Sequence, residues 1–220
     1  RIPTLLSEDH WFDGDPGHLA FHTRIWHMAE DSEHFRTADQ RLTEVASRHY
    51  VPLMEARMIH QFDHRWCTYA GADTRDLTAV EKRDIAYEPT PRYWVPEGEV
   101  ADRLAGMSWS RKWLLGWRDV CRATDERTLI ASAIPAVGSG DKFLLLFPGV
   151  QPELCAALLG SMNSLVCDYV ARQKLGGTSF KLYLIKQIPI PAPSSFSSSD
   201  LSFLVPRVVE LTYSSSSLRD

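Results

Sequence analysis

The chain has 220 residues, of which 44% are hydrophobic and 24% are charged, and its formal net charge is −4. A chain of this size can bury a core without disulfides or metals, as one large domain or as one domain with a short appendage. Its apolar runs, such as residues 143–147, are too short to cross a bilayer, and its start has no signal-peptide pattern, so we expect a cytoplasmic protein without a membrane partner.

The first half of the chain predicts a helix, an extended segment and a loop. Residues 37–47 have helical spacing, with Leu42 on the apolar side. Apolar and aromatic side chains alternate with polar ones over residues 50–66, which favours an extended segment and leaves a helix open. Residues 71–92 are charged and rich in turn formers, so they predict a surface loop.

The second half predicts three strands and then a long helix. Residues 113–121, 128–134 and 142–147 are rich in apolar and aromatic side chains and are separated by turn signals. Residues 152–172 repeat apolar side chains every three or four positions, which predicts a helix. The glycines at 176–177 then indicate where this helix ends.

The C-terminal part predicts a short strand over residues 181–188 and a terminal helix over residues 200–213 that Pro206 interrupts. Together these elements predict an α+β fold, in which a mixed sheet is joined by a long packing helix and a C-terminal helical appendage. We expect the domain to span residues 1–193, and residues 194–220 to form a linker and the terminal helix. Because the chain begins without Met and ends in a serine-rich stretch, we expect a piece of a longer protein.

No common catalytic or cofactor-binding signature is evident. The chain lacks glycine-rich dinucleotide and P-loop motifs, the G-x-S-x-G elbow, the Pro-Pro-aromatic motif of amino-methyltransferases and a spaced nuclease motif. His60 and His64 have the spacing of a zinc-protease helix, but Gln61 stands where a glutamate is required. Structural or contact roles are favoured for both histidines, and we expect no catalytic centre, metal or cofactor in this chain.

The cysteines and tryptophans favour structural roles. None of the four cysteines forms a C-x-x-C pair, which favours buried free thiols in a reducing cytoplasm over a disulfide framework. Trp109, Trp113 and Trp117 recur every four residues, which favours core packing over stacking on nucleic-acid bases.

Charge is unevenly distributed along the chain. Residues 1–100 carry 11 Lys and Arg against 18 Asp and Glu, whereas residues 101–190 carry 11 against 7. A basic middle segment on an acidic chain is compatible with one phosphate-facing surface, and equally with a chance division of solvated charges.

Several short segments occur in an order that resembles one protein family. In chain order they are residues 31–36 (DSEHFR), 50–55 (YVPLME), 58–65 (MIHQFDHR), 93–96 (YWVP), 117–120 (WRDV), 126–131 (ERTLIA), 159–174 (LGSMNSLVCDYVARQK), 176–178 (GGT) and 186–191 (KQIPIP). This order resembles the region after the catalytic domain in large N6-adenine DNA methyltransferases of type IIG restriction-modification and related phage-defence systems. Its last part is also similar to type I specificity subunits. Arg57 departs from the family pattern, which has Lys there.

The resemblance implies a target-recognition domain that binds double-stranded DNA beside a methyltransferase catalytic domain of the same polypeptide. S-adenosylmethionine would belong to that separate domain. Methylation of adenine requires the base to leave the duplex, so this module would hold the duplex and read its sequence.

Phosphate contacts are expected from the end of the long helix and the loop that follows. Small residues let the backbone approach closely, and N–H groups and a hydroxyl can donate to phosphate oxygens. The candidates are Arg172, Lys174, Gly176, Gly177, Thr178 and Lys181. The alternative is a plain helix end with a glycine cap.

Base reading is expected from arginines, which can form paired hydrogen bonds with guanine in the major groove. Arg118, Arg122 and Arg127 flank the predicted hairpin, and Arg57, His60 and Arg65 form a second set. The alternative for both sets is surface ion pairing with neighbouring acidic residues.

Two other functions stay open at this point. One is a metal-dependent nuclease or hydrolase that uses the histidines with Asp13, Asp15 or Asp63. The other is a protein-interaction module, in which the helix around residues 154–169 and the terminal helix pack against a catalytic domain or a partner subunit.

Overall fold

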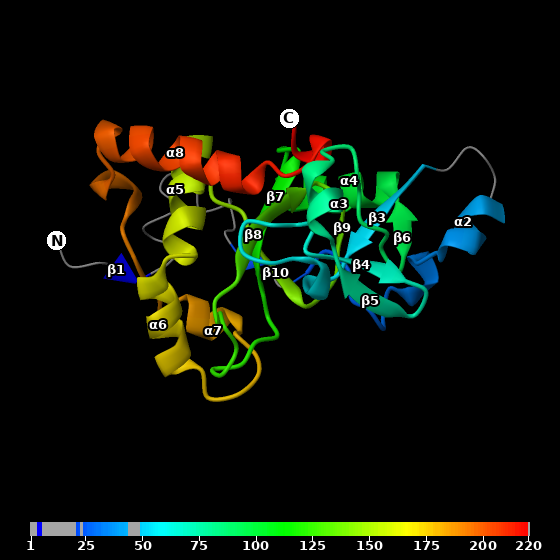
Figure 1. Ribbon diagram of the computed structural model, residues 1–220, viewed down its shortest axis with the longest axis horizontal. Helices are drawn as coiled ribbons and strands as arrows, with labels where there is room; N and C mark the ends of the chain where they lie inside the picture. The colour runs from blue at the N-terminus through cyan, green and yellow to red at the C-terminus, as the bar shows by residue number, and fades with distance from the viewer. Residues whose placement is uncertain (1–3, 6–20, 23, 44–48, 220) are drawn as a thin grey trace.

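A computed structural model describes residues 4–5, 21–22, 24–43 and 49–219 of the protein. Its centre is a four-stranded antiparallel sheet between two layers (Figure 1). In sheet order the strands are β2 (Phe21–His22), β10 (Phe143–Leu146), β7 (Trp113–Arg118) and β8 (Ala131–Pro135). The three predicted strands are confirmed, although β8 begins at Ala131 rather than at residue 128.

Both faces of this sheet are buried, which is why its strands are apolar at nearly every position. Successive side chains of a strand point to opposite faces, so neighbouring residues enter different cores. The core on the helical side includes Leu115, Trp117, Leu144 and Leu146. The opposite core includes Trp109, Leu114, Phe143 and Leu145. Core packing is therefore confirmed for Trp109 and Trp117, while Trp113 is partly buried against both cores.

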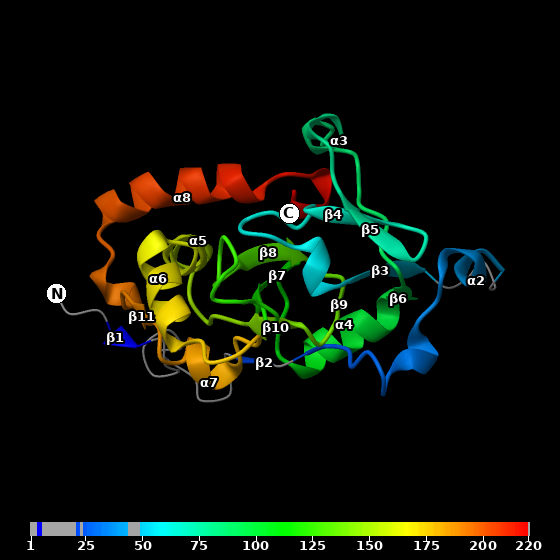
Figure 2. The same cartoon turned by 60° about the horizontal axis from the view of Figure 1, so that its bottom comes forward.

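The C-terminal part of the chain covers one face of the central sheet with helices (Figures 1 and 2). They are α5 (Pro152–Met162), α6 (Leu165–Lys174), α7 (Leu182–Ile185) and α8 (Ser198–Thr212). The strands β1 (Thr4–Leu5) and β11 (Pro189–Ile190) pair beside them, and the 3-10 turn η3 (Pro193–Ser195) leads into α8. Phe196 and Val208 pack into the helical-side core, so the predicted linker and terminal helix are packed against the domain.

The first half of the chain supplies most of the layer on the other face. Its sheet consists of β6 (Trp94–Pro96), β3 (Tyr50–Met54) and β9 (Gly138–Ser139), with β3 antiparallel to β6 and parallel to β9. Around it lie η1 (Ser32–His34), α2 (Ala38–Thr43), η2 (Ala56–Met58), the hairpin β4 (Cys67–Ala70) to β5 (Asp73–Asp76), α3 (Ala79–Arg83) and α4 (Glu97–Gly106). The combination of helices with antiparallel and mixed sheets confirms the α+β class.

The structure corrects two predictions in the first half of the chain. The extended segment predicted over residues 50–66 is a strand only to Met54, and Phe62 then takes a φ of 60° in a turn that joins His60 to Asp63. The loop predicted over residues 71–92 contains β5 and α3. A capping box fixes the start of α3 at Thr78.

Two further predictions are wrong in the second half. Residues 181–188 contain the helix α7 instead of a strand, because Leu184, Ile185 and Ile188 bury one helical face. The terminal helix α8 continues through Pro206, which lies exposed in it. A capping box at Ser197 and packing against α5 hold the helix on both sides of this proline.

The predicted helix 37–47 is present as α2, and residues 44–48 lie outside the described residues. Leu42, predicted on its apolar side, is 76% exposed. The four cysteines are buried and free. In the described part of the chain no single helix could cross a membrane by length and composition, and α5 and α6 pass that test only as a pair bent by 59°.

The long helix predicted over residues 152–172 is broken into α5 and α6 at Asn163 and Ser164. The Asn163 side chain turns toward β8. It donates to the Ala131 carbonyl oxygen at 2.9 Å and accepts from the Ala131 N–H at 3.0 Å. The Ser164 hydroxyl accepts from the Cys167 N–H and starts α6. The break thus serves two sets of hydrogen bonds that an unbroken helix would lose.

Two side chains of α6 form further hydrogen bonds with the main chain of the segment that precedes β8. Oδ1 of Asp168 accepts the main-chain N–H groups of Thr128 and Leu129, at 2.7 and 2.9 Å. Arg172 donates to two main-chain oxygens of the loop 122–127 and to Oδ2 of Asp168. We call Asn163, Asp168 and Arg172 the polar clamp.

The clamp predicts a large stability loss on Asp168→Ala. The substitution leaves two buried N–H groups without an acceptor and removes the carboxylate partner of Arg172, so we expect the free energy of unfolding to fall by about 3–5 kcal/mol. Urea unfolding measures this. Tyr169→Ala, on the exposed side of the same helix, is the control and should cost under about 1 kcal/mol. Equal losses in the two variants would contradict the clamp.

A buried histidine holds the C-terminal turn η4 (Ser216–Leu218) against the layer that the first half of the chain supplies. Nε2 of His64 lies 3.0 Å from the Ser215 hydroxyl, which in turn lies 2.5 Å from the Ser217 hydroxyl. The Ser216 N–H also donates to the Ile85 carbonyl oxygen. Burial of His64 lowers its pKa from 6.5 to about 4. The C-terminal turn is therefore packed against a neutral imidazole.

This histidine predicts a specific loss of stability in acid. The unfolded chain protonates His64 near pH 6.5, whereas the folded protein resists protonation down to about pH 4. The stability that depends on neutral His64 is therefore complete above pH 6.5 and is lost as the pH falls toward 4, by at most about 3 kcal/mol. Melting temperatures of His64→Gln should depend less on pH in this window than those of the wild type. The exposed control His49→Gln should follow the wild type, and a similar flattening in both variants would argue against His64 as the cause.

Candidate nucleic-acid interface

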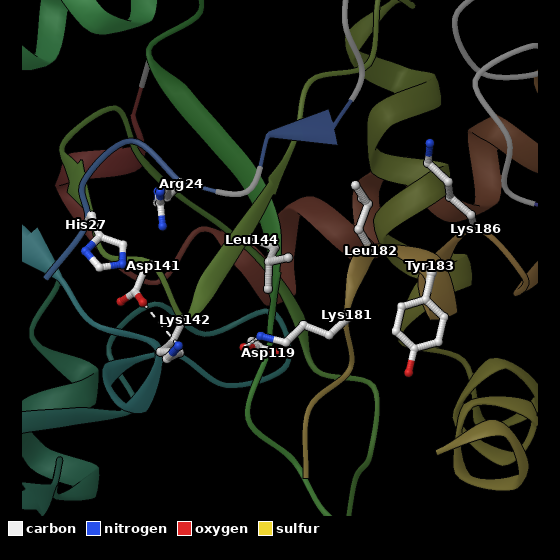
Figure 3. A pocket seen from close by; sticks show the side chains of 10 residues that line it. All are labelled: Arg24, His27, Asp119, Asp141, Lys142, Leu144, Lys181, Leu182, Tyr183 and Lys186. Carbon is white, nitrogen blue, oxygen red and sulfur yellow. Dashed lines mark hydrogen bonds and ion pairs between the residues drawn. The ribbon is translucent and has the colours of Figure 1, made fainter. Parts of the chain in front are cut away.

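A groove with a volume of about 610 Å³ lies between the start of β10, the end of β7 and α7 (Figure 3). Its basic lining residues are Arg24, Lys142, Lys181 and Lys186, and its acidic ones are Asp119 and Asp141. Lys142 lies 3.1 Å from Asp141, and Lys181 lies 2.7 Å from Asp119. Arg24 lies 3.6 Å from Glu30, which is not a lining residue. The lining itself therefore has four cations against two carboxylates, although three of these cations are ion-paired.

Main-chain hydrogen bonds at the end of β7 position the lysines of this groove. The Asp119 N–H donates to the Lys142 carbonyl oxygen at 2.8 Å, and the Phe180 N–H donates to the Asp119 carbonyl oxygen at 2.6 Å. The Asp119 side chain is only 1% exposed and holds Lys181 at the start of α7. Residues distant in the sequence are thus brought to one wall by the sheet, rather than by a local motif.

A smaller hollow of about 300 Å³ shares Asp141 and Lys142 with the groove. It is lined also by Glu55, Arg57 and Arg118. Because these two arginines come from η2 and β7, the hollow lies between the first-half layer and the end of β7 in the central sheet. The groove and this hollow together form one continuous candidate interface, which we call the basic groove.

Only one of the six predicted phosphate-binding residues lines the basic groove, and that residue is Lys181. Arg172 belongs to the polar clamp, so its guanidinium is already engaged by protein acceptors. Lys174 is exposed and reaches Gln187 at 3.4 Å. Gly176, Gly177 and Thr178 form an exposed loop beyond α6.

The first set of base-reading candidates has no ion-pair partner in the residues that the structure describes. Arg118 is half-buried, its Nε is buried without a hydrogen bond, and burial lowers the pKa of its guanidinium. Arg122 is exposed, and Arg127 is half-buried with Nη1 lacking a partner. The surface ion pairs considered for these three arginines therefore do not form.

The three residues of the second base-reading set lie in three different environments. Arg57 is exposed and lines the basic groove. His60 stacks on Trp66 with ring centroids 4.3 Å apart, and burial with the charge of Arg118 lowers its pKa. Arg65 is fully buried and donates to three main-chain oxygens of residues 82–87 at 2.7–2.8 Å. The base-reading prediction for Arg65 is therefore wrong, because no surface of it can reach DNA.

Sequence reasoning missed three basic residues of the groove, Arg24, Lys142 and Lys186. Arg24 follows β2, Lys142 precedes β10 and Lys186 follows α7, so no short sequence window contains them together. The excess of cations over residues 101–190 was a signal for Lys142 and Lys186, but not for Arg24, which lies in the acidic first half.

The histidines and carboxylates do not gather into a metal site within the described residues. No group of three His, Cys, Asp or Glu side chains there could hold an ion. His64 is bonded to the C-terminal turn, and Asp63 pairs with Lys82 at 2.7 Å. Asp13 and Asp15, proposed as partners of the histidines, lie outside the described residues.

Comparison with known proteins returns no matching family model, no matching curated protein and no matching solved structure.

Proposed function

We propose that this chain binds double-stranded DNA as the target-recognition module of an adenine DNA methyltransferase and has no catalytic centre, metal or cofactor of its own. The basic groove carries this proposal, because a DNA-binding surface needs cations that neutralise phosphates and side chains that can reach base edges. S-adenosylmethionine would bind to a catalytic domain of the same polypeptide. A cytoplasmic location agrees with four buried free thiols.

The loops next to the groove support a wider DNA-binding surface. The Cys121 N–H donates to the Thr178 carbonyl oxygen at 3.2 Å, and Val120 bridges to Ser179. These contacts bring the loop of Arg122 beside the glycine loop that follows α6. The exposed Lys174 and Arg122 therefore extend the positive surface beyond the groove.

Removal of two groove charges tests the proposal. We expect the double variant Lys142→Gln, Lys186→Gln to bind duplex DNA more weakly at every sequence. Its plot of log K against log salt should be less steep by about 2, because two phosphate contacts are lost. Fluorescence anisotropy over a salt series measures both quantities.

The matched control removes two charges elsewhere, with Arg83→Gln on α3 and Arg207→Gln on α8. This control should keep the wild-type affinity and slope. If both double variants lose the same slope, binding depends on net charge alone and the groove has no special role. If the wild type does not bind duplex at low salt, the proposed function fails.

A second function, packing against a catalytic domain, is favoured by an apolar face of α6. Tyr169 lies four and three positions after Leu165 and Val166, and the three side chains are 65%, 71% and 71% exposed. We expect Leu165→Glu to prevent binding of a methyltransferase domain supplied separately, as measured by analytical size exclusion. Val80→Glu changes an equally exposed side chain on α3 and should have no effect. Unchanged binding of Leu165→Glu would remove this face from consideration.

A further inference from the structure

The smaller hollow of the basic groove contains charged side chains of both signs whose hydrogen bonds are incomplete. It has a volume of about 300 Å³, at the small end of the range for ligand pockets. Its walls include Met28, Glu55, Arg57, Thr74, Arg118 and Lys142. A space of this size suits one ring system rather than a base pair.

The two arginines of the hollow lack acceptors. Neither guanidinium forms an ion pair or a side-chain hydrogen bond with the residues that the structure describes, and Nε of Arg118 is buried. The charge of Arg57 contributes to the lowered pKa of Arg118, so the two cations lie near each other. Arg57 is exposed to solvent, so the cost of a missing acceptor falls on the buried Nε of Arg118, and a ligand with acceptor atoms would offset it.

Glu55 lines the same hollow and needs hydrogen-bond donors, whereas the arginines need acceptors. Its Oε1 is buried and lies beside the buried hydroxyl of Tyr69. Burial and a side-chain hydrogen bond with Glu55 raise the pKa of Tyr69. The Glu55 carboxylate disfavours a phosphate group in the hollow and favours a ligand with N–H donors.

Guanine has both acceptors for the arginines and donors for the carboxylate. Its O6 and N7 atoms accept paired hydrogen bonds from arginine, and its N1–H and exocyclic amino group can donate to a carboxylate. Cytosine and adenine offer a single amino donor, so they would leave the carboxylate less satisfied. The Met28 side chain lines the same space and can contact an aromatic ring.

We propose that the hollow between η2 and the end of β7 binds one unpaired guanine base, with Arg118 and Arg57 on its acceptor edge and Glu55 on its donor edge. The hollow shares Lys142 with the larger groove, so a strand bound there can present the base. The inference rests on the proposed function for the source of the base, as a DNA strand, while a free guanine nucleotide has the same chemistry.

The test compares four duplexes that differ only in the base placed opposite one abasic site. An unpaired base leaves the stack at low cost, so the affinity difference reports the pocket. We expect the guanine duplex to bind about tenfold tighter than the adenine, cytosine and thymine duplexes. Glu55→Gln and Arg118→Lys should reduce this preference to under about twofold, because each removes one half of the recognition of guanine. Arg83→Gln is the control. A second measurement titrates guanosine and adenosine monophosphates by calorimetry.

The outcomes separate the two proposals. Binding of the paired duplex without a guanine preference overturns the pocket and leaves the proposed function standing. Selective binding of guanosine monophosphate that Glu55→Gln abolishes, with no binding of any duplex, supports the pocket and overturns the proposed function. If neither duplex nor nucleotide binds, both proposals fail.

Discussion

The polar clamp is the interaction on which the rest of the structure depends. The side chains of the clamp, Asn163, Asp168 and Arg172, form hydrogen bonds with the main chain between residue 123 and residue 131, where β8 begins. Within this segment, the Ile130 carbonyl oxygen accepts a hydrogen bond from the Arg118 N–H. The end of β7 is thereby fixed, and from it Asp119 reaches both β10 and the start of α7. Loss of the clamp would therefore disturb the groove as well as the core.

The basic groove arises from topology rather than from a basic sequence motif. The chain as a whole has a net charge of −4, and its acidic excess lies in residues 1–100. The central sheet gathers Arg24, Lys142 and Lys181 from three segments onto one wall. Field lines from such a concave positive wall reach an approaching polyanion even when the net charge of the protein is negative. The adjoining hollow is lined by two arginines and Glu55, and under the proposed function these side chains would face base edges rather than phosphates.

The sequence predicted what periodicity controls and missed what distant contacts control. The three apolar strands and the helical pattern after residue 152 were identified because side-chain spacing records burial. The break at Asn163 was missed, since it depends on the main chain of β8, which no local pattern reveals. For the same reason Arg172, which the resemblance pointed to as a phosphate ligand, lies in the clamp, and Arg65 is a buried main-chain donor. Lys181 and Arg118 were identified as residues, but not as lining residues of two hollows that share Lys142.

The most direct test of DNA binding in the basic groove is hydrogen exchange of the intact chain, with and without a saturating duplex. The account predicts slower exchange at residues 139–143 and 178–187, which surround the groove, and unchanged exchange along α8 on the outer face of α5. Protection confined to α8 or α6, with no change around the groove, would contradict it and place the nucleic acid on another surface.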